Sequence, residues 1–155
     1  MKKLITLLFI VSVLKVNSQT QISSQYDKIG NFYYGIAVVK KNGKEGAINT
    51  EGKEVIKPEW DRLSGFGKDG IGFAHKDGLV GLIDKNGKLI AKPEYERIGN
   101  FKNGKAVVKK DGKEGVMNID GKIIIAIKYD KLKIVEGGAV RATENGQEIL
   151  LKEEK

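Results

Sequence analysis

The chain offers few residues that carry out catalysis or bind metal ions, and they do not converge. It has no cysteine, which excludes disulfides, thiolate catalysis and thiolate ligands. His75 is the only histidine, so a multi-histidine metal site is excluded, and nothing places a general base beside Ser64. Residues 84–87 begin like a calcium loop but lack its later ligands. We therefore predict no catalytic residue, no cofactor and no metal site.

Carboxylates are the remaining catalytic option, since the chain has 20 aspartates and glutamates. A glycosidase needs two carboxyl groups roughly 5 to 9 Å apart. Most of the carboxylates stand at turns or at equivalent positions of a repeat, where exposure to solvent accounts for them. A secreted hydrolase is therefore the least favoured interpretation, and we predict that the protein is not an enzyme.

Lysine recurs in columns, and one column has a possible binding role. Lys53, Lys88 and Lys122 each follow a turn glycine at equivalent positions. If the copies stack in register, these side chains can contact an anionic polymer such as an acidic glycan. The structural alternative is that lysines solubilise hairpin ends and protect sheet edges, which is their commoner use.

Aromatic residues recur in two further columns. The first column is a candidate stacking platform for sugar rings and consists of Tyr26, Trp60, Tyr95 and Tyr129. The second column consists of Phe32, Phe66 and Phe101. Aromatic side chains at one repeat position more often form a core shared between copies. We expect a core position for the phenylalanines, because they have no polar tip.

These columns follow an internal repeat of 34 to 35 residues, which is typical of a repeat architecture. The first aromatic column begins the copies, which we place at 26–59, 60–94 and 95–128, with a partial fourth at 129–151. Together they form one β-repeat domain, 26–155.

Each copy contains an Asn/Asp-Gly pair between short apolar runs, which predicts a type I′ hairpin. The pairs are Asn42-Gly43, Asp77-Gly78, Asp111-Gly112 and Asn145-Gly146. We predict three strands per copy, at 36–40, 44–49 and 53–57 in the first and at equivalent positions in the second and third. Pro58 and Pro93 come after the third strand and mark a strand end or an edge. The segment from the Tyr/Trp position to the Phe position then crosses to the next copy.

The copy as a whole runs Tyr-Asp-x-Ile-x-x-Phe, then Asn-Gly-Lys-x-Gly, then Gly-Lys-x-Ile. From residue 26 to about 150 this pattern resembles the WG-repeat (KWG) family of bacterial β-repeat proteins, which are often exported and usually of unknown function. The namesake Trp-Gly pairs are replaced by Glu45-Gly46, Val80-Gly81 and Glu114-Gly115. A role of that tryptophan in relatives does not carry over, and the family supplies no catalytic residues.

The expected fold class is all-β, with tandem β-meander repeats that cover each other's apolar faces. An open twisted sheet or solenoid-like array, a closed barrel-like meander and a partial propeller all fit the pattern. We favour the open array, because a propeller usually has at least four blades of four strands.

The first residues resemble a secretory signal peptide. Lys2 and Lys3 precede eleven uncharged residues, 4–14, and a small residue, Ser18, precedes the expected cut. We predict a leader at 1–18 and a short linker at 19–25. The 28 basic residues less the three of the leader, against 20 acidic ones, leave a net charge of +5. Without cysteine the protein cannot be a lipoprotein.

Export and repetition together suggest a secreted or periplasmic interaction module that binds a protein or an envelope component. A glycan or anionic-polymer binder that uses the lysine or Tyr/Trp columns is the alternative. We expect no nucleic-acid partner and no transmembrane segment after the leader. The eleven apolar residues of the leader are themselves too few to span a bilayer. The ligand, the oligomeric state and the compartment are left open.

Overall fold

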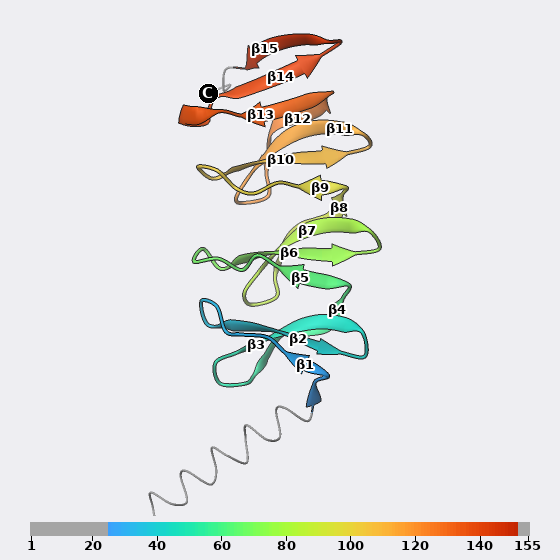
Figure 1. Cartoon of the computed structure of the whole chain (residues 1–155), viewed down its shortest axis with the longest axis vertical. Coiled ribbons are helices and arrows are strands. Elements are labelled where there is room, and N and C mark those ends of the chain that lie inside the picture. Colours follow the sequence, from blue (N-terminus) through green and yellow to red (C-terminus); the bar gives the residue numbers. More distant parts are fainter. Residues whose placement is uncertain (1–24, 152–155) are drawn as a thin grey trace, which may run out of the picture.

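The computed structural model describes residues 25–151, and the chain forms four small antiparallel sheets along one axis (Figure 1). The predicted leader and all but the last residue of the linker lie outside the described residues. Sheet 1 contains β1 (Lys28–Ile29), β2 (Ile36–Lys41), β3 (Lys44–Asn49) and β4 (Glu54–Trp60). Sheet 2 contains β5 (Arg62–Ser64), β6 (Ile71–Lys76), β7 (Leu79–Asp84) and β8 (Leu89–Tyr95).

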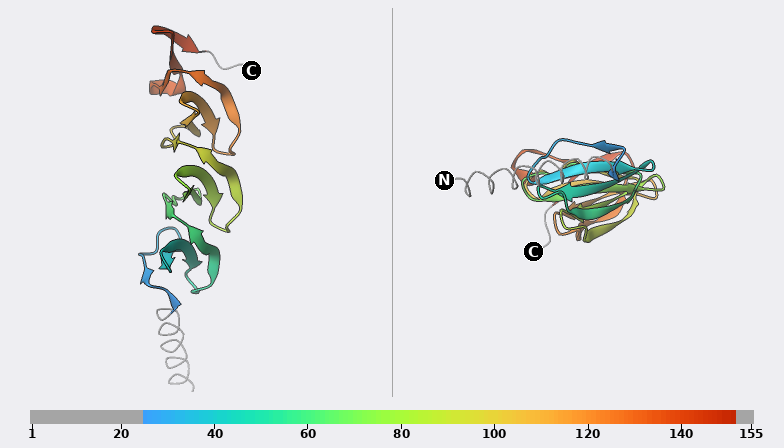
Figure 2. Two further views of the ribbon diagram at one scale, coloured as in Figure 1. Left: turned by 90° about the vertical axis from the view of Figure 1, so that its right-hand side faces the viewer. Right: turned by 90° about the horizontal axis from the view of Figure 1, so that it is seen from below.

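Sheet 3 contains β9 (Arg97–Ile98), β10 (Lys105–Lys110), β11 (Lys113–Asn118) and β12 (Ile123–Tyr129). Sheet 4 contains β13 (Lys131–Ile134), β14 (Val140–Glu144) and β15 (Gln147–Leu151), with a 3₁₀ turn at Glu136–Gly138. Figure 2 shows the sheets one above another, and they largely overlap when seen from below. The all-β tandem array is therefore confirmed in its open form, without closure into a barrel.

The four Asn/Asp-Gly hairpins form as predicted. Both central residues of each turn have positive φ, for example 50° at Asn42 and 79° at Gly43. A type I′ turn requires this geometry, and its twist matches that of the flanking strands. The turn also sets the register, with Lys41 opposite Lys44 across the first hairpin.

The prediction of three strands per copy is wrong, because the segment after each Tyr/Trp position is itself a strand. The chain leaves β4 at Trp60, passes through one residue and pairs again as β5, where Leu63 lies opposite Ala74. Strands of two to four residues carry no periodicity, which is why the sequence pattern missed them.

The third predicted strand is also longer than expected. β4 continues through Pro58 to Trp60, and β8 continues through Pro93 to Tyr95. Both strands lie at the end of their sheet, so the missing proline N–H breaks no ladder. The pairing of β3 with β4 shifts by two residues on either side of Gly46: Glu45 lies opposite Trp60, but Ala47 lies opposite Ile56. The sequence predicted either a strand end or an edge at these prolines. The prolines do lie in edge strands, but the strands do not end there.

This bulge explains the glycine at the Gly46 position of the first three copies. A Cβ atom on Gly46 would lie 2.5 Å from the Ile56 carbonyl oxygen and 2.7 Å from the Pro58 nitrogen. At Gly81 the Ala91 oxygen would lie at 2.4 Å. The crossing strand therefore leaves no room for a side chain at this position.

The hydrophobic core lies between consecutive sheets. Ile56 and Trp60 of sheet 1 pack with Leu63 and Ile83 of sheet 2, and equivalent clusters join sheets 2 and 3 and sheets 3 and 4. Each sheet thus buries its apolar face against a neighbour, as expected of a repeat array. The prediction of a core phenylalanine column is wrong at Phe32, which is 46 % exposed because no sheet precedes the first copy among the described residues.

Candidate functional site

The Tyr/Trp column is buried: Trp60, Tyr95 and Tyr129 lie in the clusters between sheets, and Tyr26 lies in a cluster within the first copy. Tyr26, Trp60, Tyr95 and Tyr129 are between 5 % and 9 % exposed. A lysine ammonium lies over each ring at 5.0 to 6.0 Å from its centroid, which is within the range of a cation–π interaction. The faces of these rings are therefore occupied by the protein itself, and ligand contact by them stays a prediction.

Burial also affects two of the tyrosine hydroxyls. The pKa of Tyr26 is raised by burial and by the adjacent Glu54, whose carboxylate accepts a hydrogen bond from the hydroxyl at 3.3 Å. The pKa of Tyr95 is raised in the same way by burial and by Glu94. Both phenols thus stay protonated and act as hydrogen-bond donors.

A carboxylate comes directly after each of these aromatic residues and accepts a hydrogen bond from a hairpin turn. Asp27 accepts from the Asn42 N–H at 2.7 Å, and Asp61 accepts from the Asp77 N–H at 2.7 Å. In the third copy the longer Glu96 reaches one residue further, to the Gly112 N–H at 2.8 Å. Sequence reasoning assigned these carboxylates to solvent, although their fixed place after the aromatic residue was visible.

The same carboxylates also join neighbouring sheets. Asp61 forms an ion pair with Lys44 of sheet 1 at 2.5 Å, and Asp130 forms one with Lys113 of sheet 3 at 2.5 Å. At the junction of sheets 2 and 3 the lysine is replaced by Leu79, and Glu96 pairs instead with Lys109 of its own sheet at 3.5 Å.

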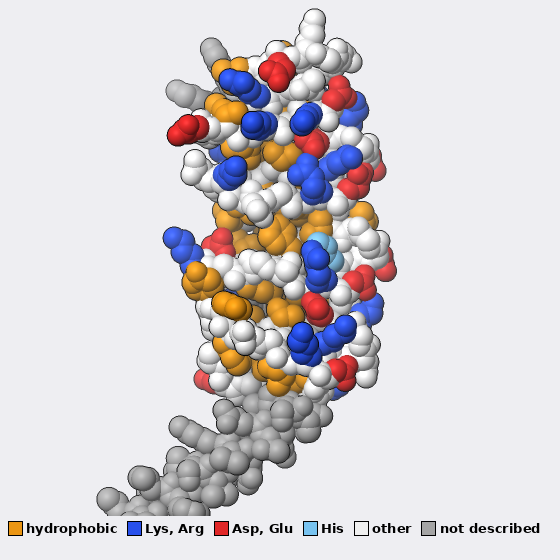
Figure 3. All heavy atoms as spheres, in the orientation of Figure 1, with side chains coloured by type: hydrophobic (Ala, Val, Ile, Leu, Met, Phe, Trp, Pro, Cys, Tyr) orange, Lys and Arg blue, Asp and Glu red, His pale blue; other side chains and the backbone are white. Residues whose placement is uncertain are grey.

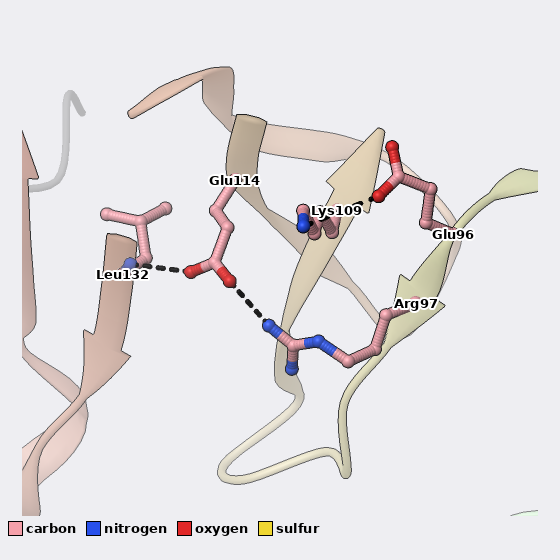
Figure 4. Close-up of polar contacts among 5 residues, drawn as sticks. All are labelled: Glu96, Arg97, Lys109, Glu114 and Leu132. Atoms are coloured by element: carbon pink, nitrogen blue, oxygen red, sulfur yellow. Dashed lines mark hydrogen bonds and ion pairs between the residues drawn. The ribbon is translucent and has the colours of Figure 1, made fainter. Parts of the chain in front are cut away.

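A second set of carboxylates occupies the position of the family's namesake tryptophan. Glu114 accepts from the Arg97 guanidinium at 2.6 Å and from the Leu132 N–H at 2.7 Å, so it links β9 to the first strand of the next sheet (Figure 4). Glu45 accepts from the Leu63 N–H at 2.7 Å in the same way. Glu114 is the one charged side chain buried among the described residues, at 8 % exposure.

The junction of sheets 2 and 3 lacks this carboxylate, because the equivalent residue is Val80. A hollow of about 480 Å³ lies here, and its lining includes Arg62, His75, Val80 and Ile98. The Arg62 guanidinium lies 3.2 Å from His75 Nε2. The pKa of His75 is lowered by burial and by Arg62, an effect that Glu45 partly offsets, so a neutral ring accepts from the guanidinium near neutral pH.

The lysine column lies at the turns between the second and third long strands of the first three sheets. Lys53, Lys88 and Lys122 are exposed, and their backbone N–H groups donate to Asn49, Asp84 and Asn118. Among the ion pairs of residues 25–151, none involves these three ammonium groups. They are therefore open to an anionic ligand, and such contact stays a prediction.

The loop between β1 and β2 exposes three consecutive aromatic residues, which we call the aromatic loop. Phe32, Tyr33 and Tyr34 are 46 %, 63 % and 67 % exposed. Tyr34 has a φ of 48°, a conformation that costs a tyrosine roughly 1 to 2 kcal/mol. The equivalent residue of sheet 3 is Asn103, which tolerates it. Sequence reasoning missed this loop, although its aromatic residues are contiguous.

Other classes of site receive no support from the described part of the chain. Within residues 25–151, no three or more His, Asp or Glu side chains gather to hold a metal ion. No helix in that range is long and apolar enough to cross a membrane.

The fold and these contacts define a class: an open array of small β-sheets joined through repeated aromatic and carboxylate contacts. The model of the WG containing repeat matches the chain four times, at residues 22–44, 46–79, 81–113 and 115–147. The chain therefore belongs to the WG-repeat family, as the resemblance predicted. No curated protein matches it.

Proposed function

We propose that the protein is a non-catalytic interaction module that is exported and binds a protein or a component of the cell envelope through the aromatic loop. The observation that carries the proposal is the exposure of Phe32, Tyr33 and Tyr34 at one end of the array. Tyrosine and phenylalanine are enriched in protein interfaces, where large rings bury much area. A monomer gains nothing from exposing three of them together.

The backbone of this loop supports the same proposal. Tyr34 occupies a left-handed position next to Gly35, where an asparagine would be unstrained. Strain at an exposed site that the fold does not require is typical of function. A hollow of about 240 Å³ beside the loop, lined in part by Tyr33 and Phe66, gives a partner side chain a place to insert.

Two further features support the remaining parts of the proposal. The basic, apolar and small-residue order of the first 18 residues is typical of an export signal. Catalysis generally needs unlike residues that converge at one place, whereas the carboxylate contacts of the first and last junctions repeat one another. The expected partner is therefore a protein or a glycan of the periplasm or the exterior.

Binding to envelope fractions tests the proposal. The protein is immobilised and incubated with peptidoglycan, lipopolysaccharide, membrane proteins and capsular polysaccharide. The variant Tyr33→Ser with Tyr34→Asn removes both rings, and its asparagine copies the unstrained turn of Asn103 and Gly104. We expect the variant to melt no lower than the wild type and to lose the partner. Retention of the same partner by the folded variant would refute the aromatic loop as the binding surface.

N-terminal sequencing of the protein recovered from cell fractions tests export separately. A mature chain that begins near residue 19 in the periplasm or the medium is expected. A chain that still begins at Met1 in the cytoplasm would contradict export.

The lysine column favours a second candidate, an anionic-polymer binder. Its support is that Lys53, Lys88 and Lys122 are exposed at equivalent turns without ion pairs in the described structure. Binding of this kind weakens steeply with salt, because the contacts are screened within about 8 Å at physiological ionic strength. Loss of a polysaccharide partner in the triple Lys→Gln variant, together with such salt dependence, would favour this candidate over the aromatic loop.

A further inference from the structure

Neighbouring sheets meet at three equivalent junctions, and the middle junction lacks the carboxylate that the other two contain. In the last junction, Glu114 accepts from the guanidinium of Arg97 at 2.6 Å and from the backbone N–H of Leu132 at 2.7 Å. In the first junction, Glu45 accepts from the N–H of Leu63 at 2.7 Å. In the middle junction, the carboxylate is replaced by the aliphatic Val80.

The donors of the missing carboxylate are both still present. Arg62 stands two residues after Trp60, as Arg97 stands two residues after Tyr95. Ile98 holds the place of Leu63 and Leu132. Alternate N–H groups of an edge strand point away from its partner. The N–H of Gly99 donates to Val107 within the sheet, so that of Ile98 points outward.

Both donors line the hollow of about 480 Å³ between sheets 2 and 3. This volume lies within the range of small-molecule sites. Phe73 and Val80 supply apolar surface in the lining, whereas Arg62 and His75 supply polar atoms. Figure 3 shows hydrophobic side chains exposed over the middle of the stack, with Lys and Arg side chains in a column beside them.

One carboxylate already lies at the rim, and it is engaged elsewhere. Glu96 lines the hollow but accepts from the Gly112 N–H at 2.8 Å and pairs with Lys109 at 3.5 Å. These contacts hold the pKa of Glu96 below its usual value, chiefly through the Gly112 N–H. Arg62 instead contacts the His75 ring, which is a neutral and weaker partner than a carboxylate.

We propose that this hollow is a binding site for the carboxylate group of an organic acid with an apolar body, which takes the place that Glu45 and Glu114 hold in the flanking junctions. The carboxylate accepts from the Arg62 guanidinium and from the Ile98 N–H. The apolar part of the ligand lies against Val80 and Phe73. A free acid and the C-terminal residue of a peptide present the same chemistry.

The single histidine gives the site its own spectroscopic reporter. His75 lies beside Arg62 and is also influenced by Glu45. A carboxylate bound at Arg62 replaces the contact between the guanidinium and the His75 ring. Binding should therefore move the ring resonances of His75.

The experiment is an NMR titration of the full chain, without a histidine tag, with hexanoate and phenylacetate. Hexanamide and phenylacetamide are the uncharged controls. We expect both acids to shift the His75 ring resonances saturably and both amides to leave them unchanged. The tripeptide Ala-Ala-Phe, with a free or an amidated C-terminus, separates the two sources of the carboxylate: tighter binding of the free-terminus peptide than of phenylacetate assigns a peptide, and the reverse assigns a free acid.

Two variants test the geometry. Val80→Glu restores the side chain that the flanking junctions carry, so it should fold, fill the site and abolish binding of both acids. Arg62→Gln should weaken binding roughly 10- to 100-fold, the range for a hydrogen bond to a charged group. Lys92→Gln removes an exposed charge of β8 in the same sheet, outside the residues that line the hollow, and should leave binding unchanged.

The outcomes are decisive either way. Equal shifts with acids and amides, no saturation below about 10 mM, or full binding by a folded Val80→Glu variant would each overturn the proposal. Phe32, Tyr33 and Tyr34 do not line this hollow, so its failure leaves the proposed function standing. Failure of the envelope experiment likewise leaves this site untouched.

Discussion

Sheets 1 to 3 and sheet 4 share the same Asn/Asp-Gly hairpin but differ in whether another strand crosses it. In the first three sheets the next strand crosses closely over Gly46, Gly81 or Gly115. In sheet 4, β15 is the last strand of the described chain, and Ile149 takes the glycine's place with 39 % exposure. The glycine is therefore required by the crossing strand and not by the hairpin. A repeated residue in an array marks a repeated contact, and it disappears where the contact disappears.

The largest expected effect comes from Gly81→Ala. The new Cβ would lie 2.4 Å from the Ala91 oxygen and 2.7 Å from the Pro93 nitrogen, so β8 must move. We expect the free energy of unfolding to fall by about 3 kcal/mol, at the upper end for overpacking. Urea denaturation measures it, with Ile149→Ala as the matched control, for which we expect a loss below about 1 kcal/mol. Equal losses at the two positions would break the comparison.

The next effect concerns how sheet 4 is held to sheet 3. Glu114→Val copies the middle junction and removes the acceptor of the Leu132 N–H. We expect a loss of about 2 kcal/mol, because a buried donor loses a charged partner. Thermal unfolding followed by circular dichroism measures this loss. An unchanged melting temperature would show that Glu114 does not hold the two sheets together.

A smaller effect separates crowding from backbone conformation. Gly112 has a φ of 76°, and a Cβ there would meet nothing within 4 Å. Gly112→Ala therefore carries only the cost of the left-handed conformation, about 1 kcal/mol. The urea midpoint should fall clearly less than for Gly81→Ala. A loss as large as that of Gly81→Ala would mean that space at the crossing is not the dominant cost.

The smallest effect is a dependence of stability on pH. Hydrogen bonds from Lys44 and the Asp77 N–H lower the pKa of Asp61, and those from Lys113 and the Asn145 N–H lower that of Asp130. Because the folded-state pKa is below the unfolded one, the stabilisation is present above the unfolded value near 3.9 and is lost as pH falls through the folded value. Melting temperatures measured from pH 6 to 2 should decline less steeply in Asp61→Asn with Asp130→Asn. An identical decline would contradict this role.

Much of the array could be predicted because local residues determine it. The Asn/Asp-Gly pairs fixed the hairpins, since few other residues adopt positive φ at both turn positions. The continuation of β4 through Pro58 could not be predicted, because only the edge position of that strand makes proline acceptable. The short strand β5 could not be predicted either, since Arg62–Ser64 forms a strand through its pairing with β6 and shows no sequence pattern of its own.

The candidate sites were harder to predict, because they depend on contacts between copies. The sequence shows that Val80 replaces a glutamate, but not that Arg62 and the Ile98 N–H remain in place around it. Tyr34 before Gly35 was visible as a departure from Asn103-Gly104, and the equivalent Asn103 is exposed as well. The Tyr/Trp column shows the opposite case: its residue types suit a platform or a core, and the burial of the rings agrees with the core.

The passage from one sheet to the next through a single residue has a mechanical consequence. Strands such as β6 and β10 lie across the axis of the stack, and β4 joins β5 through Asp61 alone (Figure 1). A force applied at the two ends of the chain therefore loads the junctions in series and peels strands apart one pair at a time. Each sheet that opens releases about 34 residues, or roughly 120 Å of extended chain. The array would lengthen in discrete steps under tension, each absorbing the work of unfolding one sheet while its neighbours stay folded.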